Sequence, residues 1–277
     1  MTQHVMIIGG GIAGCMTAME LVKRGFRVTI VERNQIASQT SGESSWAGAG
    51  LVFPLLPWMY RDEVSHLALA GANLYPDICE QLLRETGISP ELNECGMLIK
   101  PPYDQSLATD WCKRNKLDFE LINQDLFIPS VAQVRNPRLL QALRQWLVLH
   151  GVTLREHTQL APIQEHDALD AWRTTTGESL HADIFVVTSG AWSYELLKDT
   201  TANLSIKPMR GQILLYHMPL GTLPHIVYQD GFYLLQRQDG YLLAGSTLED
   251  VGFDTGVTES ARYEMQAKAE AIVPELK

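Results

Sequence analysis

The hydrophobic pattern at the start of the chain predicts a buried strand, a tight turn and a helix. Val5 to Ile8 is an apolar run without polar alternation, which is typical of a strand covered on both faces. Glycines 9, 11 and 14 follow directly, and residues 12–24 carry apolar and small side chains at helical spacing. A second apolar run, residues 28–31, ends at Glu32. This order is typical of the first half of a dinucleotide-binding unit.

Later segments predict that the chain returns to the same parallel sheet and then forms antiparallel strands. Helical patterns cover residues 62–85, 104–116, 136–150 and 259–272, with Pro76 expected to kink or divide the first of them. Residues 95–100, 152–154 and 183–187 read as strands, and the crossover from helix to strand at 136–154 favours parallel pairing. After residue 207, alternating segments 211–217, 232–236 and 241–245 indicate an antiparallel sheet with a hairpin. We therefore expect an α/β fold, α+β overall, with a Rossmann-like domain and a second, antiparallel-sheet domain.

Composition and charge narrow the class of protein. The 277 residues are 45% hydrophobic and 19% charged, enough for two globular domains. The net charge of -10 opposes a general affinity for nucleic acid. No apolar run approaches a membrane span, and the first strand begins too near Met1 for a signal peptide, so we expect a cytoplasmic protein. The four cysteines and eight histidines show no metal-ligand spacing, so no metal is expected.

The glycine turn and the acidic residue predict how a dinucleotide is held. Gly9 permits the tight turn, Gly11 lets the backbone approach a pyrophosphate, and Gly14 lets the helix pack close to the strand. The helix N-terminus then faces the phosphates, and Glu32 can accept both ribose hydroxyls. The alternative is a structural glycine-rich turn. If the site binds a cofactor, that cofactor is FAD or NAD.

Two more segments have both a structural and a functional interpretation. Residues 39–50 are rich in Gly, Ala and Ser, which suits a flexible linker. The same small residues would also let backbone amides approach a flat ring system, with the hydroxyls of Ser44 and Ser45 near phosphate oxygens. Residues 183–192 repeat the pattern of strand, glycine turn and helix, which indicates either a plain turn or a second approach to the same dinucleotide.

Taken together, these motifs resemble those of the D-amino acid oxidase and glycine oxidase family of flavoproteins. The matching motifs are the glycine turn with Glu32-Arg33, residues 44–51 (SSWAGAGL), residues 188–192 (TSGAW) and residues 208–212 (PMRGQ), and their order covers nearly the whole chain. The resemblance selects FAD over NAD. It implies an FAD-binding domain of residues 1–85 and 134–206 and a substrate domain of residues 86–133 and 207–277.

The resemblance also implies residue roles. Three residues fall where the family binds or reacts with substrate beside the flavin: Tyr228, the weaker candidate Tyr233, and Leu51 near the flavin face. For both tyrosines, strand packing is the alternative interpretation. The residues implied to bind the cofactor are Gly9, Gly11, Ile12, Ala13, Gly14, Glu32, Arg33, Ser44, Ser45, Ala47, Gly48, Ala49, Leu160, Ser189, Gly190 and Trp192.

The chemistry that the resemblance implies is oxidation of an amine next to a carboxylate. The hydride passes to flavin N5, and the resulting imino acid is hydrolysed by water. The substrate would be glycine, a D-amino acid or a related small amine, and the acceptor dioxygen or a quinone. Which of these is used stays open, as does the oligomeric state, a homo-oligomer included. A related 2-hydroxy acid oxidase is an alternative, and an NAD-dependent dehydrogenase would need a catalytic His or Lys that we cannot identify.

One departure from the family concerns its C-terminal part. Family members continue with a Gly-Leu-Arg-Pro-like segment, whose arginine grips the substrate carboxylate, and then a glycine-rich segment. Neither follows residue 272 in this chain. We therefore expect that the chain is an inactive fragment; the alternative is a natural non-catalytic FAD-binding protein.

Overall fold

The chain forms two compact units, each built from separate segments. The computed structural model describes residues 2–39, 43–164, 169–200, 202 and 204–276. The first unit comprises Met1–Gly48, Gln81–Pro90 and Asn136–Pro208, and the second comprises Ala49–Glu80, Glu91–Arg135 and Met209–Lys277. Residues 49–80, which we predicted to belong to the FAD-binding domain, thus group with the second unit. The predicted boundaries, as limits of ligand-binding domains, stay a prediction.

The first unit is built on a parallel sheet in the order β12-β1-β2-β9. Its strands are β1 (His4–Ile8), β2 (Arg27–Val31), β9 (Thr153–Arg155) and β12 (Ile184–Val187). The helices α1 (Ile12–Lys23) and α5 (Asn136–Leu149) contact each other, and α1 also contacts β2. Because α1 connects β1 to β2, α5 leads into β9, and all pairs in this sheet are parallel, the prediction of a Rossmann-like parallel sheet is confirmed.

The other face of this sheet carries its own small core. Met6 and Ile8, which alternate along β1, pack with Val31 and with Trp172 and Leu180. The last two lie in the hairpin of β10 (Ala171–Arg173) and β11 (Ser179–His181). Both faces of β1 are therefore buried, which explains why its sequence lacks polar alternation.

The second unit is built on a seven-stranded sheet in the order β13-β16-β15-β14-β5-β7-β6. The predicted hairpin of β15 and β16 is present, and every neighbouring pair is antiparallel except β14 and β5. The strands are β5 (Met97–Lys100), β6 (Glu120–Ile122), β7 (Asp125–Ile128), β13 (Ile213–His217), β14 (Ile226–Gln229), β15 (Phe232–Gln236) and β16 (Tyr241–Gly245).

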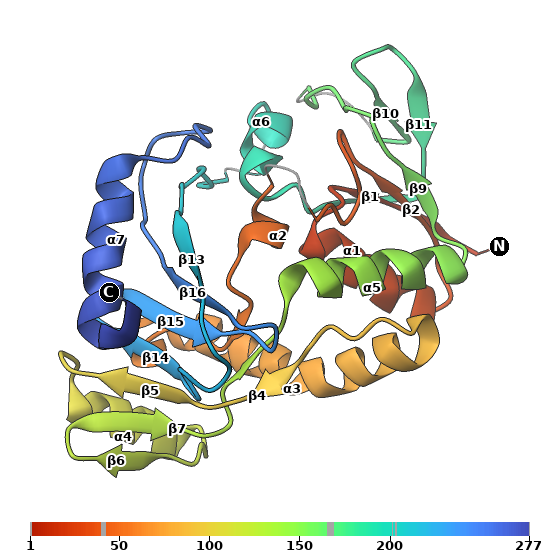
Figure 1. The fold of residues 1–277 in the computed structure, drawn as a ribbon. Helices are drawn as coiled ribbons and strands as arrows, with labels where there is room; N and C mark the ends of the chain where they lie inside the picture. Colours follow the sequence, from red (N-terminus) through yellow and green to blue (C-terminus); the bar gives the residue numbers. More distant parts are fainter. Residues whose placement is uncertain (1, 40–42, 165–168, 201, 203, 277) are drawn as a thin grey trace. The chain divides into compact units, whose positions relative to one another are not determined.

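Alternate residues of β15 enter two different cores. Phe232 and Leu234 pack toward α7 (Glu259–Ile272), whereas Tyr233 and Leu235 pack in the core that also holds α4 (Gln105–Arg114). Figure 1 shows α7 beside the strands β13 and β16, which it contacts. Since both faces of β15 are covered, all five of its residues are buried.

The remaining elements are short except for α3 (Asp62–Thr86). Pro76 lies inside α3, so of the two predicted effects it does not divide this helix, and the kink stays a prediction. The buried residues Cys79 and Leu82 anchor the part of α3 after the proline, which offsets the one lost backbone hydrogen bond. The short elements are α2 (Ser44–Ala47), α6 (Ser193–Leu197), β3 (Leu51–Val52), β4 (Asn93–Glu94), β8 (Ala132–Gln133), η1 (Pro57–Met59), η2 (Gly190–Trp192) and η3 (Pro274–Leu276).

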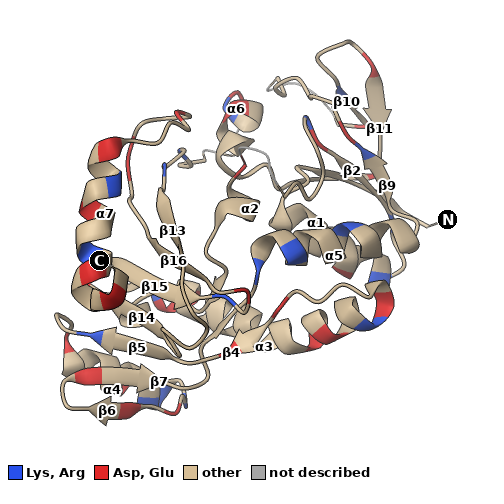
Figure 2. Cartoon of the chain, viewed as in Figure 1, with Lys and Arg blue, Asp and Glu red and all other residues tan. Residues whose placement is uncertain are grey.

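Charges of both signs are mixed on the surface elements. Figure 2 shows acidic residues alternating with Lys and Arg along α7, whereas the charged residues of α3 are acidic except for Arg84. Such alternation is typical of solvated helix faces. Within the described residues, no helix is long and apolar enough to cross a membrane.

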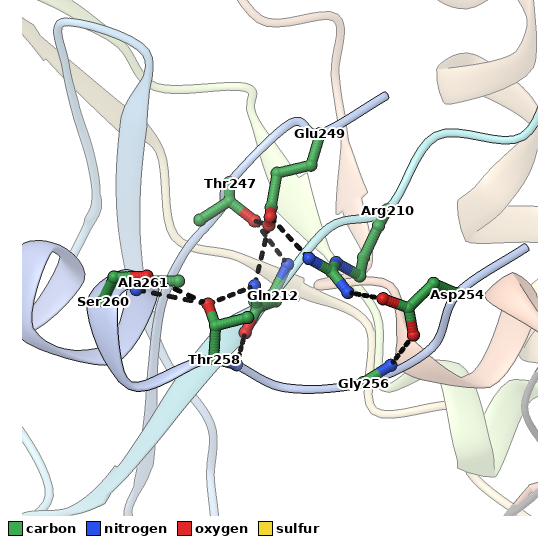
Figure 3. A network of polar contacts seen from close by, with 9 residues as sticks. All are labelled: Arg210, Gln212, Thr247, Glu249, Asp254, Gly256, Thr258, Ser260 and Ala261. Atoms are coloured by element: carbon green, nitrogen blue, oxygen red, sulfur yellow. Dashed lines mark hydrogen bonds and ion pairs between the residues drawn. The ribbon is translucent and has the colours of Figure 1, made fainter. Parts of the chain in front are cut away.

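A polar network joins the start of β13 to the loop between β16 and α7 (Figure 3). Arg210 donates to Glu249 Oε2 at 2.8 Å and to Asp254 Oδ2 at 2.6 Å. The amide nitrogen of Gln212 donates to Glu249 Oε1 at 2.7 Å, and the backbone N–H of Thr258, the N-cap of α7, donates to Gln212 Oε1. This network fixes the loop 246–258 on the sheet edge.

The network predicts a specific loss of stability in acid. The hydrogen bond from Arg210, helped by those from Thr247 and Gln212, lowers the pKa of Glu249 to about 2, below the ordinary value of 4.5. A lowered folded-state pKa stabilises the protein above pH 4.5, and this contribution is lost as the pH falls toward 2. Glu249→Gln should therefore flatten the fall of unfolding free energy in that window, as measured by urea denaturation.

The control for this experiment is Glu264→Gln, which removes an exposed i,i+4 ion pair with Lys268 on α7. We expect the control to follow the wild-type pH profile. Parallel curves for the wild type and Glu249→Gln would contradict the role of the network.

Candidate functional site

The glycine turn after β1 is shaped by close backbone contacts. Gly9 has a φ of +110°, and its N–H donates to the Val31 carbonyl at 2.9 Å. A Cβ on Gly14 would lie 2.0 Å from the Gly9 carbonyl oxygen, and one on Gly9 would lie 2.7 Å from the carbonyl oxygen of Thr188. Gly9 and Gly14 are therefore required by the packing of strand, turn and helix.

Gly11 differs, because the nearest atom to a Cβ there belongs to a side chain and not to the backbone. Its added Cβ would meet only the Ser45 hydroxyl oxygen, at 3.0 Å. That oxygen accepts the N–H of Ile12 at 3.1 Å. The first amides of a helix have no helical partner and attract negative charge. Gly11, Ile12 and Ala13 thus surround a place suited to an acceptor oxygen, where the sequence predicts the pyrophosphate.

Glu32 is buried at the end of β2, with 9% of its surface exposed. Its Oε2 accepts the N–H of Gly10 at 2.8 Å, and its Oε1 accepts the N–H of Asn34 at 2.9 Å. Each carboxylate oxygen can accept two hydrogen bonds, so both can still accept a hydroxyl. The carboxylate is therefore fixed in place before a ribose arrives.

A pocket in the first unit opens beside Glu32 and the glycine turn. The buried indole Nε1 of Trp46, one of its lining residues, has no hydrogen-bond partner among the described residues. A donor of this kind is suited to an incoming acceptor. The pocket is lined by Gly10, Gly11, Glu32, Gln35, Ala37, Ser38, Glu43, Ser45, Trp46 and Leu140.

The stretch rich in small residues forms α2 rather than a linker, at least from Ser44 on; residues 40–42 lie outside the described part of the chain. Asn136, at the start of α5, donates to the Ser45 carbonyl at 2.9 Å. A Cβ on Gly48 would lie 2.7 Å from the same amide nitrogen. Ser45 is thereby brought to the glycine turn. Roles for Ser44, Ala47, Gly48 and the buried Ala49 in cofactor binding stay predictions.

The glycine turn that follows β12 lies against the glycine turn that follows β1. The hydroxyl of Thr188 donates to the carbonyl of Ile8 at 3.1 Å and to that of Gly9 at 3.0 Å, and the Ser189 hydroxyl donates to Ile8 at 3.0 Å. Gly190 follows with a φ of +54°. The structure thus brings the two glycine turns together, and a second approach to the same dinucleotide stays a prediction.

Arg33 and Trp192 also meet, although they are far apart in sequence. The Arg33 guanidinium carbon lies 3.9 Å from the centroid of the Trp192 ring. Its Nη2 lies 3.5 Å from Glu43 Oε1, which accepts the Asn34 side-chain amide at 2.6 Å. These contacts hold the residues after Glu32 against the second turn.

Leu160 forms an isolated antiparallel bridge with Thr174 and is 5% exposed. The backbone hydrogen bonds of this bridge run from Ala161 to Arg173 and from Thr175 to Gln159. They do not use the amide and carbonyl of Leu160. Its backbone groups are therefore available for the cofactor binding that the resemblance implies for Leu160, which stays a prediction.

The three predicted substrate-site residues share one core of the second unit. Tyr228 on β14 and Tyr233 on β15 face each other directly across the two strands, and Leu51 packs against the same core. The Tyr228 hydroxyl oxygen accepts the N–H of Gly231 at 3.0 Å. Burial is the main factor that raises the pKa of both tyrosines, so their hydroxyls stay protonated at neutral pH.

Arg237 is a buried residue of this unit and lies in the turn between β15 and β16. Its guanidinium donates to the carbonyl of Val134 and, at 2.6 Å, to that of Ala49. Burial, together with the charge of Arg135, lowers its pKa to about 10. A cation thus holds the segment that leads into Leu51. The only sequence feature that indicates the burial of Arg237 is its position between two apolar strands.

Comparisons with known proteins assign the family. The sequence matches the family described as "FAD dependent oxidoreductase" over residues 4–277. The chain belongs to this family. It is 35% identical to a glycine oxidase of Pseudomonas aeruginosa and 33% identical to one of Pseudomonas putida, covering 100% of this chain and 79% of each relative.

Comparison with solved structures supports the same assignment. A crystal structure of glycine oxidase from Geobacillus kaustophilus matches with a TM-score of 0.86 at 26% identity, covering 99% of this chain and 80% of that one. Iminodiacetate oxidase from Chelativorans sp. matches with a TM-score of 0.81 at 25% identity, covering 98% and 79%. The predictions of family, fold class and FAD are confirmed.

The residues of this FAD-dependent oxidoreductase fit the cofactor. Gly11 lines the pocket without a side chain to fill it, Glu32 offers acceptors for ribose hydroxyls, and Trp46 offers an unpaired donor. Within the described residues, no group of three or more His, Cys, Asp or Glu side chains could hold a metal ion. The donor set is that of a dinucleotide site.

Proposed function

We propose that this protein oxidises a small amino acid or amine, of the glycine or D-amino acid type, to the corresponding imino acid. The observation that supports this most is the similarity to glycine oxidases, which extends over the whole chain at up to 35% identity among the relatives named above. The similarity to an iminodiacetate oxidase supports secondary amines as further substrates. When bound, FAD supplies the hydride acceptor. Dioxygen is the proposed final acceptor, since these relatives are named oxidases.

The residues of this chain would bind and orient. Glu32 and the first amides of α1 would hold the adenosine and diphosphate of FAD. In the second unit, the Tyr228 oxygen accepts the Gly231 amide, so the hydroxyl proton can be donated elsewhere. We propose that it is donated to the carboxylate of the substrate. No side chain needs to act as a base if the neutral amine supplies the electron pair, so positioning would be the main contribution of the protein.

The test uses the protein produced at the full length of its gene. We expect bound flavin after purification, bleaching of its absorbance by glycine, D-amino acids or secondary amines, and peroxide formation in air. A panel of 2-hydroxy acids serves as the comparison. Bleaching by hydroxy acids alone would overturn the proposed substrate class, and absence of any FAD binding would overturn the cofactor site.

Tyr228→Phe should impair turnover more than folding. Losing a hydrogen bond to a charged carboxylate should lower kcat/KM for the amine by about tenfold or more, as measured by steady-state kinetics. The matched control is Tyr216→Phe, because the buried Tyr216 hydroxyl has no hydrogen-bond partner among the described residues. Its removal should leave both kcat/KM and melting temperature close to wild type. Equal kcat/KM in Tyr228→Phe and wild type would contradict the assignment.

A further inference from the structure

The loop that follows Glu32 separates two pockets of the first unit. Gln35, Ala37 and Ser38 line the pocket that contains Glu32 and the glycine turn. The same three residues also line a second pocket, whose other lining residues include Arg144 and Glu156. Residues 35–38 of this loop therefore form a wall between the two pockets. The predicted adenosine site lies on one side of this wall and an ion pair on the other.

The ion pair holds both backbone groups of Ile36 in this wall. Arg144 on α5 forms two hydrogen bonds with Glu156, Nη1 to Oε1 at 2.6 Å and Nη2 to Oε2 at 3.2 Å. The Ile36 N–H donates to Glu156 Oε1 at 2.9 Å, and the Ile36 carbonyl accepts from Arg144 Nη1 at 3.1 Å. One buried residue of the loop is thus clamped by a cation and an anion from two other elements.

The clamp reaches the glycine turn through Ile36 and Ala37. A Cβ on Gly10 would lie 2.7 Å from Ile36 Cγ1, so the side chain of Ile36 rests on that glycine. The N–H of Ala37 donates to the Gly10 carbonyl at 2.7 Å, and Ala37 itself has a φ of +52°. The position of Ile36 therefore determines how the loop meets the glycine turn, whose Gly10 amide in turn holds Glu32.

The charges and the partial burial of Arg144 and Glu156 favour a stable ion pair. Burial alone would raise the pKa of Glu156, but the hydrogen bonds from Arg144 and from the Ile36 N–H outweigh it and lower this pKa. The side chains are partly covered, with 38% of Arg144 and 25% of Glu156 exposed. Glu156 therefore stays ionised and paired at neutral pH.

We propose that Arg144 and Glu156 are positioning residues for the adenosine half of FAD, which they serve by holding the wall 35–38 against the glycine turn. Neither residue lines the pocket beside Glu32, so they act through Ile36 and Ala37. The inference rests on the proposed function only in so far as this pocket binds the adenosine of FAD.

The experiment compares FAD with ligands that contain one half of it. Affinities for FAD, ADP and FMN are measured by titration for wild type, Arg144→Met, Glu156→Gln and the double variant. Each single variant should weaken FAD and ADP about tenfold, because a charge-assisted clamp is lost. The double variant should be no worse than either single one. FMN, which lacks the adenosine half, should change by less than about twofold.

A matched control pair lies next to the clamp. Arg155, the last residue of β9, forms a similar two-bond ion pair with Glu178, at 2.9 and 2.7 Å. Both bonds join these two side chains to each other and not to the loop. Arg155→Met and Glu178→Gln should leave FAD affinity within about twofold of wild type. A loss in the controls as large as in the clamp variants would overturn the positioning role.

Two results distinguish failure of the inference from failure of the proposed function. If wild-type protein binds neither FAD nor ADP, the proposed cofactor site is wrong. If wild type binds both but Arg144→Met and Glu156→Gln bind equally well, or lose FMN as much as FAD, only the positioning role is overturned. Hydrogen exchange of wild type is a test that needs no variant to fold: the Ile36 and Ala37 amides should be protected without ligand, and rapid exchange would refute the clamp.

Discussion

Gly14→Ala should prevent the first unit from folding normally and abolish FAD retention. The new Cβ would lie 2.0 Å from the carbonyl oxygen of Gly9 and would also crowd the Thr188 hydroxyl at 2.9 Å. The obstacle is backbone, so no side-chain rotation relieves it, and α1 would have to move off the turn. We expect a loss of about 4 kcal/mol or more in unfolding free energy, measured by urea denaturation, with no flavin in the purified protein.

Gly71→Ala is the matched control for this substitution. Gly71 lies inside α3, and a Cβ there would meet nothing within 4 Å. Since alanine is the better helix former, we expect a gain of up to about 1 kcal/mol. Retention of flavin and normal stability in Gly14→Ala would show that α1 does not need its close approach to β1.

The parts of the fold that the sequence predicts well are those set by local periodicity. The predicted helix 259–272 has the same limits in the structure, where Thr258 accepts the N–H of Ala261 as N-cap. The hairpin of β15 and β16 and the strands around the glycine turn were also predicted, because burial on both faces leaves a recognisable apolar run. The division of α3 at Pro76 does not occur, because a local rule ignores the burial that holds the rest of the helix in place.

The supporting residues of the candidate site could not be predicted in the same way. Arg144 and Glu156 lie on a helix and beside a strand, and nothing in their spacing points to Ile36, more than a hundred residues earlier. Arg237 likewise meets Ala49 only because the tertiary fold brings the turn after β15 to the segment before β3. Such pairs depend on tertiary position, whereas the glycines and Glu32 belong to one continuous motif.

Glu32→Gln should weaken FAD more than the loss of a ribose contact alone would suggest. The carboxylate accepts two backbone amides, those of Gly10 and Asn34, one on each oxygen. A glutamine can accept only one of them, because its NH₂ group would face the other N–H as donor to donor. One buried amide then loses its partner, at a cost of about 1 to 3 kcal/mol, before any ribose hydroxyl is considered.

The expected result is a loss of FAD affinity of about a hundredfold, since two charge-assisted hydrogen bonds to ribose, each worth about 1.5 kcal/mol or more, are weakened as well. Titration with FAD and FMN, together with the melting temperature of the cofactor-free protein, separates the two effects. The damage to the glycine turn lowers the melting temperature, whereas the ribose contact affects FAD but not FMN. Glu20→Gln, which removes only an exposed ion pair with Lys23 on α1, should change none of these values. If FAD and FMN affinities fell equally in Glu32→Gln, the ribose would have to lie away from Glu32, and the acid would serve only to fix the turn.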